Sequence, residues 1–108
     1  MEEKRAYKRK PISLYTDILG PKNLEFMGEC LVTDACESGF AIESESNLSA
    51  GQKILLKFPL LNNMVFLSGE IVRSDKGFFY PLYGVKILEY DCINFNVFKN
   101  YINNPLLQ

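Results

Sequence analysis

Residues 25–44 read EFMGECLVTDACESGFAIES, and apolar and polar side chains alternate twice along this segment. The first run covers residues 25–34, the second covers residues 38–44, and a polar link over Asp34–Gly39 joins them. Successive side chains of a β-strand point to opposite faces, so an alternation of period two is typical of half-buried strands. The segment therefore predicts two consecutive strands connected by a short link.

The same period of two recurs on both sides of this segment. Turn-forming residues such as Gly20, Pro21 and Asn62 separate the runs from one another. The additional predicted strands are residues 12–18, 53–60, 64–73 and 83–90. Six short strands at nearly regular spacing favour an antiparallel β-barrel or sandwich, since closure removes exposed sheet edges.

The pattern changes over residues 91–104, where apolar side chains recur at helical spacing. Asp91 is suited to cap the start of a helix, and Pro105 follows its expected end. The apolar positions are Ile93, Val97, Phe98, Tyr101 and Ile102. We expect a C-terminal helix that packs on the barrel or plugs one end, with docking on a partner protein as the alternative.

A length of 108 residues with 47% hydrophobic and 23% charged side chains suits one compact soluble domain. No run approaches the roughly 18 apolar residues of a membrane helix, and the first ten residues lack the apolar centre of a signal peptide. We therefore expect a cytoplasmic protein that does not insert into membranes.

The chain contains no histidine, which excludes every catalytic pair or metal site that depends on imidazole. No paired carboxylates, phosphate loop or combination of nucleophile and base stands out. The three cysteines, Cys30, Cys36 and Cys92, lack metal-binding spacing and suit small buried thiols. We expect a binding protein with no catalytic residue, no metal and no cofactor.

Positive charge is concentrated at the N-terminus. Residues 1–10 contain five basic and two acidic side chains, a balance of +3, whereas the other 98 residues contain seven basic and eleven acidic ones, a balance of -4. We expect residues 1–11 to form a flexible basic arm. Such an arm suits a phosphate ligand, an anionic membrane surface or nucleic acid, or is simply solvated.

Two motifs fall outside the alternation of the strands. The first is an RxxxR spacing made by Arg5 and Arg9, which places both side chains on one side of a helix or an extended chain. Arginine binds phosphate with two donors, pairs with a guanine edge and stacks on bases. The second motif runs from Asp34 to Gly39. Alone, the first spacing also occurs by chance, and the second also forms an ordinary turn.

Together and in this order, the two motifs resemble those of the PilZ domain family of bacterial cyclic di-GMP receptors, which pairs RxxxR with [D/N]xSxxG. Further similarity extends over Leu48–Gly51, Gly69–Arg73 and Tyr83–Ile87. The resemblance implies a mainly β fold, a six-stranded antiparallel PilZ-type β-barrel with a C-terminal α-helix. It also implies one PilZ domain over residues 1–108, with the barrel over residues 12–90.

The resemblance implies a site for cyclic di-GMP. Arg5 and Arg9 would wrap the ligand, Asp34 would hold a guanine edge, and Gly39 would make room for it. Cys36 occupies the serine position of the motif, and a thiol is the weaker hydrogen-bonding group. Additional candidates are Lys4, Lys8 and Ser38.

The resulting hypothesis is a receptor or adaptor for second-messenger signalling, a monomer or weak dimer. Cyclic di-GMP would order the arm and change the surface offered to an unidentified protein partner. The alternative is a degenerate PilZ-like interaction module that does not bind cyclic di-GMP. A third interpretation is that single-stranded nucleic acid binds to the arm and to exposed Tyr80 or Tyr83. The acidic charge of the remaining chain opposes such binding, so we expect no nucleic-acid partner.

Overall fold

The computed structural model describes residues 10–60, 63–77 and 79–89, together with residues 96, 99, 100 and 102. This part of the chain forms six β-strands, each of which overlaps one of the six predicted segments. Their bounds are Lys10–Leu19 (β1), Phe26–Cys36 (β2), Gly39–Glu43 (β3), Lys53–Leu60 (β4), Asn63–Asp75 (β5) and Leu82–Glu89 (β6). The prediction of a mainly β chain with six strands is confirmed.

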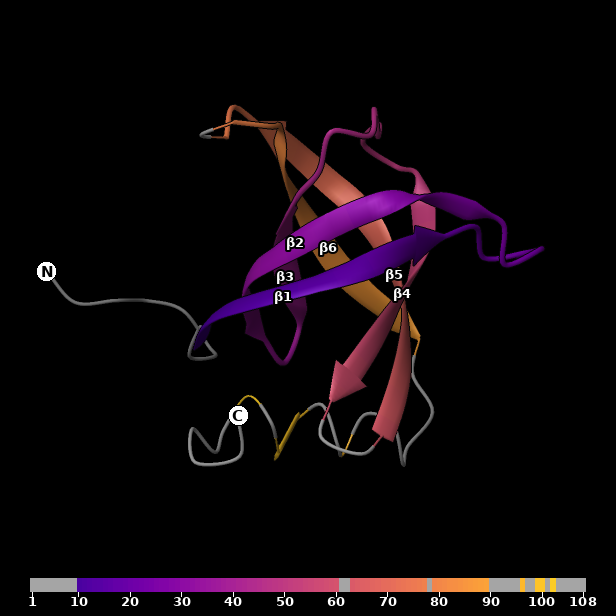
Figure 1. The fold of residues 1–108 in the computed structure, drawn as a ribbon, viewed down its shortest axis with the longest axis vertical. Helices are drawn as coiled ribbons and strands as arrows, with labels where there is room; N and C mark the ends of the chain where they lie inside the picture. Colours follow the sequence, from indigo (N-terminus) through magenta and orange to yellow (C-terminus); the bar gives the residue numbers. More distant parts are fainter. Residues whose placement is uncertain are drawn as a thin grey trace, which may run out of the picture.

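The strands form a closed barrel in the order β1-β2-β3-β6-β5-β4, and all neighbours pair antiparallel (Figure 1). The barrel closes where β1 meets β4, at the pairs Ile18 with Leu56 and Leu19 with Leu55. The hydroxyl of Thr16 donates a hydrogen bond to a backbone carbonyl of β4 and reinforces this seam. Closure leaves no free edge between the six strands.

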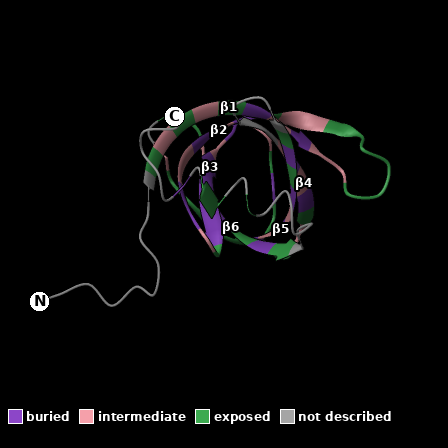
Figure 2. Ribbon diagram, turned by 90° about the horizontal axis from the view of Figure 1, so that it is seen from below, coloured by how far each residue is buried: buried purple, intermediate pink, exposed green. Residues whose placement is uncertain are grey.

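The core lies inside the barrel and follows the alternation of the strands, as the buried positions in Figure 2 show. Val65, Leu67 and Ile71 of β5 are fully buried, whereas Met64 before Val65 and Phe66 after it are exposed. The largest fully buried side chains of the other strands are Ile18, Val32, Ile42, Ile54 and Leu56. Aliphatic side chains from all parts of the ring thus fill the interior, as a small barrel requires.

The arm predicted over residues 1–11 ends earlier in the structure, because Lys10 and Pro11 already belong to β1. Lys10 pairs with Ala35 of β2, and Pro11 pairs with Asp34. Proline has no N–H group and is tolerated at the beginning of a strand, so it does not block this pairing. The rest of the predicted arm lies outside the described residues.

The link predicted over residues 34–39 is too long. β2 continues through Cys36, and the connection to β3 consists of the two residues Glu37 and Ser38. A register shift in the β2–β3 pairing lies directly before Asp34 and interrupts the strict alternation. The pattern of side chains therefore ends at this position although the strand itself continues.

Tyr83 is buried and is not the exposed aromatic residue that the nucleic-acid interpretation requires. Its hydroxyl donates to the carbonyl oxygen of Ser46 at 2.9 Å and accepts from the N–H of Leu48 at 3.1 Å. These two bonds fix the connection between β3 and β4 against β6. Tyr80, by contrast, is exposed.

The helix predicted over residues 91–104 falls mainly outside the described residues and stays a prediction. Of this segment the structure describes Asn96, Lys99, Asn100 and Ile102, and the side chain of Ile102 belongs to the hydrophobic core cluster. Among the residues that the structure describes, no helix is long and apolar enough to span a membrane.

Candidate functional site

The Asp-to-Gly motif forms the end of the β2–β3 hairpin. Cys36 pairs with Gly39 across the turn, and both residues are buried. The sulfur of Cys36 lies 3.4 Å from the hydroxyl oxygen of Ser38, within hydrogen-bonding distance. The carbonyl oxygen of Ser38 accepts a 3.0 Å hydrogen bond from the N–H of Ile87 in β6. The turn is thereby held against β6, with its thiol and hydroxyl side by side.

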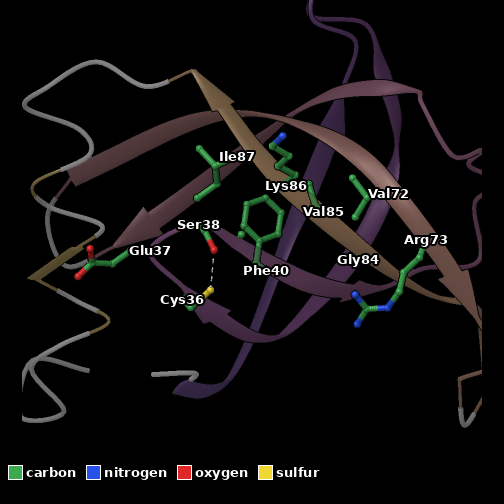
Figure 3. A pocket seen from close by; sticks show the side chains of 11 residues that line it. Cys36, Glu37, Ser38, Phe40, Val72, Arg73, Gly84, Val85, Lys86 and Ile87 are labelled. Carbon is green, nitrogen blue, oxygen red and sulfur yellow. Dashed lines mark hydrogen bonds between the residues drawn. The ribbon is translucent and has the colours of Figure 1, made fainter. Parts of the chain in front are cut away.

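This turn forms one side of a pocket of about 490 Å³ on the outside of the barrel (Figure 3). The start of β3 and strands β5 and β6 form the rest of its wall. The lining residues are Cys36, Glu37, Ser38, Gly39, Phe40, Val72, Arg73, Gly84, Val85, Lys86 and Ile87. The volume lies within the range of about 300 to 1,000 Å³ that is typical of small-molecule sites.

Arg73 of β5 brings a guanidinium group to this pocket. Its side chain crosses Gly84 of β6 so closely that a Cβ atom added there would lie 2.7 Å from Nη1 and 3.0 Å from Cζ. Arg73 Nε donates to the Asp75 carboxylate at 3.1 Å, and the two side chains are 56% and 55% exposed. Solvent screening weakens such a pair, and the guanidinium keeps further N–H donors for a ligand.

Lys86 of β6 adds a second positive charge at the pocket, and its side chain is exposed. Glu37 in the turn is the one acidic residue among those that line it. Two cationic side chains against one carboxylate favour an anionic ligand at this surface. Lys86 extends from β6, where its backbone pairs with Gly39 of the motif, and Arg73 extends from β5, the next strand of the barrel. Both cations therefore lie on strands that follow the motif around the barrel.

Gly39 has a packing role that is independent of any ligand. A Cβ atom at this position would collide with the backbone carbonyl oxygen of Val85 in β6. Only glycine lets β3 approach β6 this closely at the point where the two strands begin to pair. The glycine of the motif is therefore required by the barrel itself.

Asp34 lies on β2 two residues before Cys36. It is half-buried and is not among the residues that line the pocket. Its backbone pairs with Pro11 on one side and Ala41 on the other. The basic arm joins the barrel beside it, because Lys10 pairs with the next residue of β2. The structure thus brings the point where the arm is attached to the same end of β2 as the motif.

The structure places four of the eight sequence-predicted site residues, and their role in binding stays a prediction. Cys36, Ser38 and Gly39 lie together in the pocket, and Asp34 lies next to it on β2. The four remaining candidates, Lys4, Arg5, Lys8 and Arg9, lie outside the described residues.

Sequence reasoning missed Arg73 and Lys86 as site residues. In the sequence both residues are polar positions of segments in which apolar and polar side chains alternate. Such positions are typical of any solvent-facing side of a strand. The signal that could have found them is their location on two strands that pair with each other, β5 and β6. Two basic side chains on the outer face of adjacent strands lie close together and create a local positive charge.

A family model described as the PilZ domain matches residues 3–104 of the chain. The chain belongs to the PilZ domain family. PilZ domains form a known family of cyclic di-GMP receptors. The resemblance carried by RxxxR and the Asp-to-Gly motif is therefore confirmed at the level of the family.

Solved structures show the same fold. The inhibitor of motility MotI/DgrA of Bacillus subtilis aligns with a TM-score of 0.76 and 15% identity over 98% of this chain. The chain spans about half of that protein, 53% of its length. The PilZ domain of CeSA from a cellulose-synthesizing bacterium aligns with a TM-score of 0.69 and 12% identity, over 92% of this chain and 98% of that one.

A third similar structure is the PilZ domain of YcgR from Escherichia coli, solved with cyclic di-GMP. It aligns with a TM-score of 0.70 and 10% identity, over 94% of this chain and 90% of that one.

No curated protein matches the chain. Within residues 10–60, 63–77 and 79–89 and the four described residues beyond them, no group of three acidic, cysteine or histidine side chains could hold a metal ion.

Proposed function

We propose that this PilZ domain is a receptor for cyclic di-GMP that couples the level of the second messenger to a protein partner. The observation that carries the proposal is the pocket that the motif turn lines together with the cations Arg73 and Lys86. Cyclic di-GMP presents two phosphates and two guanine bases. Positive side chains and hydrogen-bonding groups of the motif suit that combination.

Each candidate residue has a role that follows from its chemistry. The Asp34 carboxylate accepts hydrogen bonds from the N–H pair on the Watson–Crick edge of guanine. Arg5 and Arg9 contact phosphates and stack on the bases. Cys36 and Ser38 offer a thiol and a hydroxyl at the same end of the hairpin. Lys4 and Lys8 add charge near a second stacked ligand.

The place where the arm joins the barrel supports its part in binding. Lys10 pairs with Ala35, which lies between Asp34 and Cys36 in the motif. Consecutive Cα atoms are about 3.8 Å apart, so Arg9 is tethered one residue before the position of β1 that pairs with Ala35 of β2. Arg5 is five residues from Lys10, and an extended chain of that length reaches about 17 Å. The tether therefore lets both arginines reach a ligand bound at the hairpin.

Calorimetric titration of cyclic di-GMP, with GTP as the control ligand, tests the proposal. The wild-type protein is expected to bind at micromolar concentration or tighter. The Arg5→Ala, Arg9→Ala double variant and the Arg73→Ala variant are each expected to lose at least about tenfold in affinity, because each removes a charge-assisted contact. Lys22→Ala, in the exposed turn between β1 and β2, is the matched control and should bind as the wild type does.

Absence of binding to folded wild-type protein would refute the receptor. Equal losses in Arg73→Ala and Lys22→Ala would show that the pocket is not the site and that the loss reflects general charge. Binding of GTP with the same affinity would show a general anion site, since GTP carries guanine and phosphate but not the cyclic dinucleotide.

Ordering of the arm is the proposed means by which ligand binding reaches a partner. The arm carries a high density of charge and little apolar surface, so without an anion it should not pack. We expect low hydrogen-exchange protection over residues 1–9 in the free protein and higher protection with saturating cyclic di-GMP. An arm that is already protected, or one that the ligand leaves unchanged, would contradict the switch.

The alternative function, an interaction module that does not bind the ligand, is favoured by one observation. The family's serine position is occupied by Cys36, whose buried thiol lies against Ser38. Restoring the hydroxyl in Cys36→Ser should strengthen binding up to about tenfold if the site is active. A module whose site is inactive for other reasons would bind no ligand before or after the substitution.

A further inference from the structure

A second hollow lies on the outside of the barrel, separate from the candidate ligand pocket. It is a groove of about 830 Å³ between β1, β2, the end of β3 and the connection that precedes β6. The two share no lining residue, and they lie at opposite ends of β3, where Gly39 lines the pocket and Glu43 lines the groove. Because β3 has five residues, the Cα atoms of Gly39 and Glu43 lie about 13 Å apart. In Figure 1 the β5–β6 connection and the β2–β3 turn accordingly lie at opposite ends of the barrel.

Aromatic side chains line this groove and are exposed to solvent. Tyr15 is 74% exposed, Phe26 61%, Phe79 79% and Tyr80 47%. A single exposed aromatic residue is common on protein surfaces, but four around one groove form an apolar patch of the kind that marks interaction sites. Aromatic residues are also enriched among the side chains that dominate binding energy at protein interfaces.

The charge of the groove has one sign. Glu29, Glu43 and Glu45 line it, and no lysine or arginine is among its lining residues, all of which the structure describes. The candidate ligand pocket has the opposite balance, with two cations and one carboxylate. An anionic ligand would therefore be repelled from the groove, and a cationic one attracted to it.

The floor of the groove is held in place by serine hydroxyls. Ser44 Oγ donates to the carbonyl oxygen of Glu29 at 2.7 Å, and Ser46 Oγ donates to that of Met27 at 3.0 Å. Gly28 has a φ of 131°, and a Cβ atom there would collide with the Ser46 hydroxyl. The segment after β3 is thereby fixed close against β2. A surface built in advance loses less conformational entropy when it binds.

The connection that carries the aromatic residues Phe79 and Tyr80 is held close to an acidic side chain. A Cβ atom on Gly77 would lie 2.8 Å from Oε2 of Glu43 and would collide with the carbonyl oxygen of Tyr80. Glycine at position 77 thus brings the aromatic and acidic parts of the groove together. Aromatic faces next to carboxylates are the surroundings in which guanidinium and ammonium groups are bound.

We propose that this groove is a docking surface for an arginine-rich, partly apolar segment of a partner protein. Arginine fits both features of the groove, because its planar guanidinium pairs with carboxylates and stacks on aromatic rings. Apolar side chains beside the arginines pack on the remaining aromatic surface. The three carboxylates oppose docking of a second copy through the same face, because they would then face one another.

The probe is a six-residue peptide, acetylated and amidated, in which arginine and leucine alternate. It is titrated into the full-length protein and followed by amide chemical shifts and by calorimetry. The largest shifts are expected at Leu31, Glu43–Ser46 and Phe79. A peptide with neutral citrulline in place of arginine is expected to bind at least about tenfold more weakly, because it keeps the shape and loses the charge.

Matched variants locate the binding. Glu29→Gln with Glu45→Gln removes two exposed charges of the groove, and Phe79→Ser removes an exposed ring; each is expected to weaken binding about fivefold to tenfold. Glu25→Gln with Glu70→Gln changes the net charge equally outside the groove. Phe66→Ser likewise removes a partly exposed ring from β5. Both controls are expected to stay within about twofold of the wild type.

Three results would overturn the proposal. The first is that the peptide shifts amide signals outside the groove, or that the groove variants and their controls weaken peptide binding equally. Either result would mean general attraction of the peptide to an acidic protein. The second is binding that appears only after Lys4, Arg5, Lys8 and Arg9 are changed to glutamine, which would identify the chain's own arm as the occupant. The third is concentration-dependent dimerisation that Phe79→Ser abolishes, which would identify a second copy.

Discussion

Gly39 is the position where a single added carbon is expected to do most damage to the barrel. The atom that a Cβ would meet is a backbone carbonyl of β6, which cannot move aside without opening the β3–β6 pairing. We predict that Gly39→Ala lowers the free energy of unfolding by about 1 to 3 kcal/mol, as overpacking does. Urea denaturation without any ligand measures the effect.

Gly20→Ala is the control for this substitution. A Cβ atom on Gly20 has its nearest neighbour at 3.6 Å, which is ordinary van der Waals contact. Its stability should therefore change by less than about 0.5 kcal/mol. Equal stability of the two variants would show that β3 and β6 adjust to a side chain and that the motif glycine serves the ligand alone.

Cys30 makes the stability of the protein depend on pH. Burial raises the pKa of its thiol to about 12 from an ordinary value near 9, and the neighbouring Asp17 carboxylate adds to the rise. The unfolded chain therefore releases this proton at lower pH than the folded protein does. The contribution of Cys30 is complete below about pH 9 and is lost as the pH rises toward 12.

Urea denaturation between pH 7 and pH 11 tests this dependence in the wild type and in Cys30→Ala. Above pH 9 the wild-type free energy of unfolding should fall more steeply than that of the variant, by at most about 1.4 kcal/mol per pH unit. Every other ionisable side chain is present in both proteins, so its contribution cancels in the comparison. Parallel pH profiles would contradict the raised pKa.

The candidate site was predictable only where it is contiguous in sequence. Asp34, Cys36 and Gly39 follow one another at a recognisable spacing, and the structure keeps them at one hairpin. Arg73 and Lys86 reach the same pocket through the pairing of β5 with β6, which contains a register shift between Ile71 and Arg73. A one-residue change of register reverses the face of every side chain, so the sequence alone does not determine which basic residues meet.

At the level of strands, alternation predicted all six elements, because the barrel buries one face of most strands. The exception is β3, where the four consecutive residues 39–42 are all buried. The errors lie at strand ends. Pro11 and the polar end of β2 have the composition of a loop, yet they pair with each other in the β1–β2 ladder. Pairing with a distant part of the chain stabilises strand structure in segments whose own strand propensity is weak. A pattern within one segment does not reveal such pairing.

The seam between β1 and β4 is the place where the barrel is closed by the shortest ladder. Thr16 donates its hydroxyl proton to the carbonyl oxygen of Lys57 across this seam, and its side chain is buried. We predict that Thr16→Val lowers the free energy of unfolding by about 0.5 to 1.5 kcal/mol, because an isosteric side chain leaves that carbonyl without its donor. Faster amide exchange at Leu55 should accompany the loss.

Thr33→Val is the matched control for the seam. The hydroxyl of Thr33 lies 3.5 Å from the carbonyl oxygen of Ala41, at the outer limit of a hydrogen bond. Its replacement should therefore cost less than that of Thr16 and leave exchange at Leu55 unchanged. Equal effects of the two substitutions would show that the β1–β4 seam does not depend on the threonine.

Considered as a whole, the barrel carries surfaces of opposite charge at the two ends of β3. The pocket at the Gly39 end offers Arg73 and Lys86, and the groove at the Glu43 end offers carboxylates and aromatic rings. An anionic ligand and a cationic partner segment would therefore not compete for one surface. With this separation, the proposed ligand and the proposed partner segment would both have room on one small domain.

Binding of cyclic di-GMP to the folded barrel should raise its thermal stability. A ligand that binds only the native state stabilises it by RT ln(1 + [L]/Kd), which is about 2.7 kcal/mol at a hundredfold excess over Kd. For a chain of this size that corresponds to a rise in Tm on the order of 10 °C. We expect this shift in the wild type and in Glu29→Gln, Glu45→Gln, and a much smaller one in Arg73→Ala at the same ligand concentration. Differential scanning calorimetry measures it, and an equal shift in Arg73→Ala would place the ligand elsewhere on the barrel.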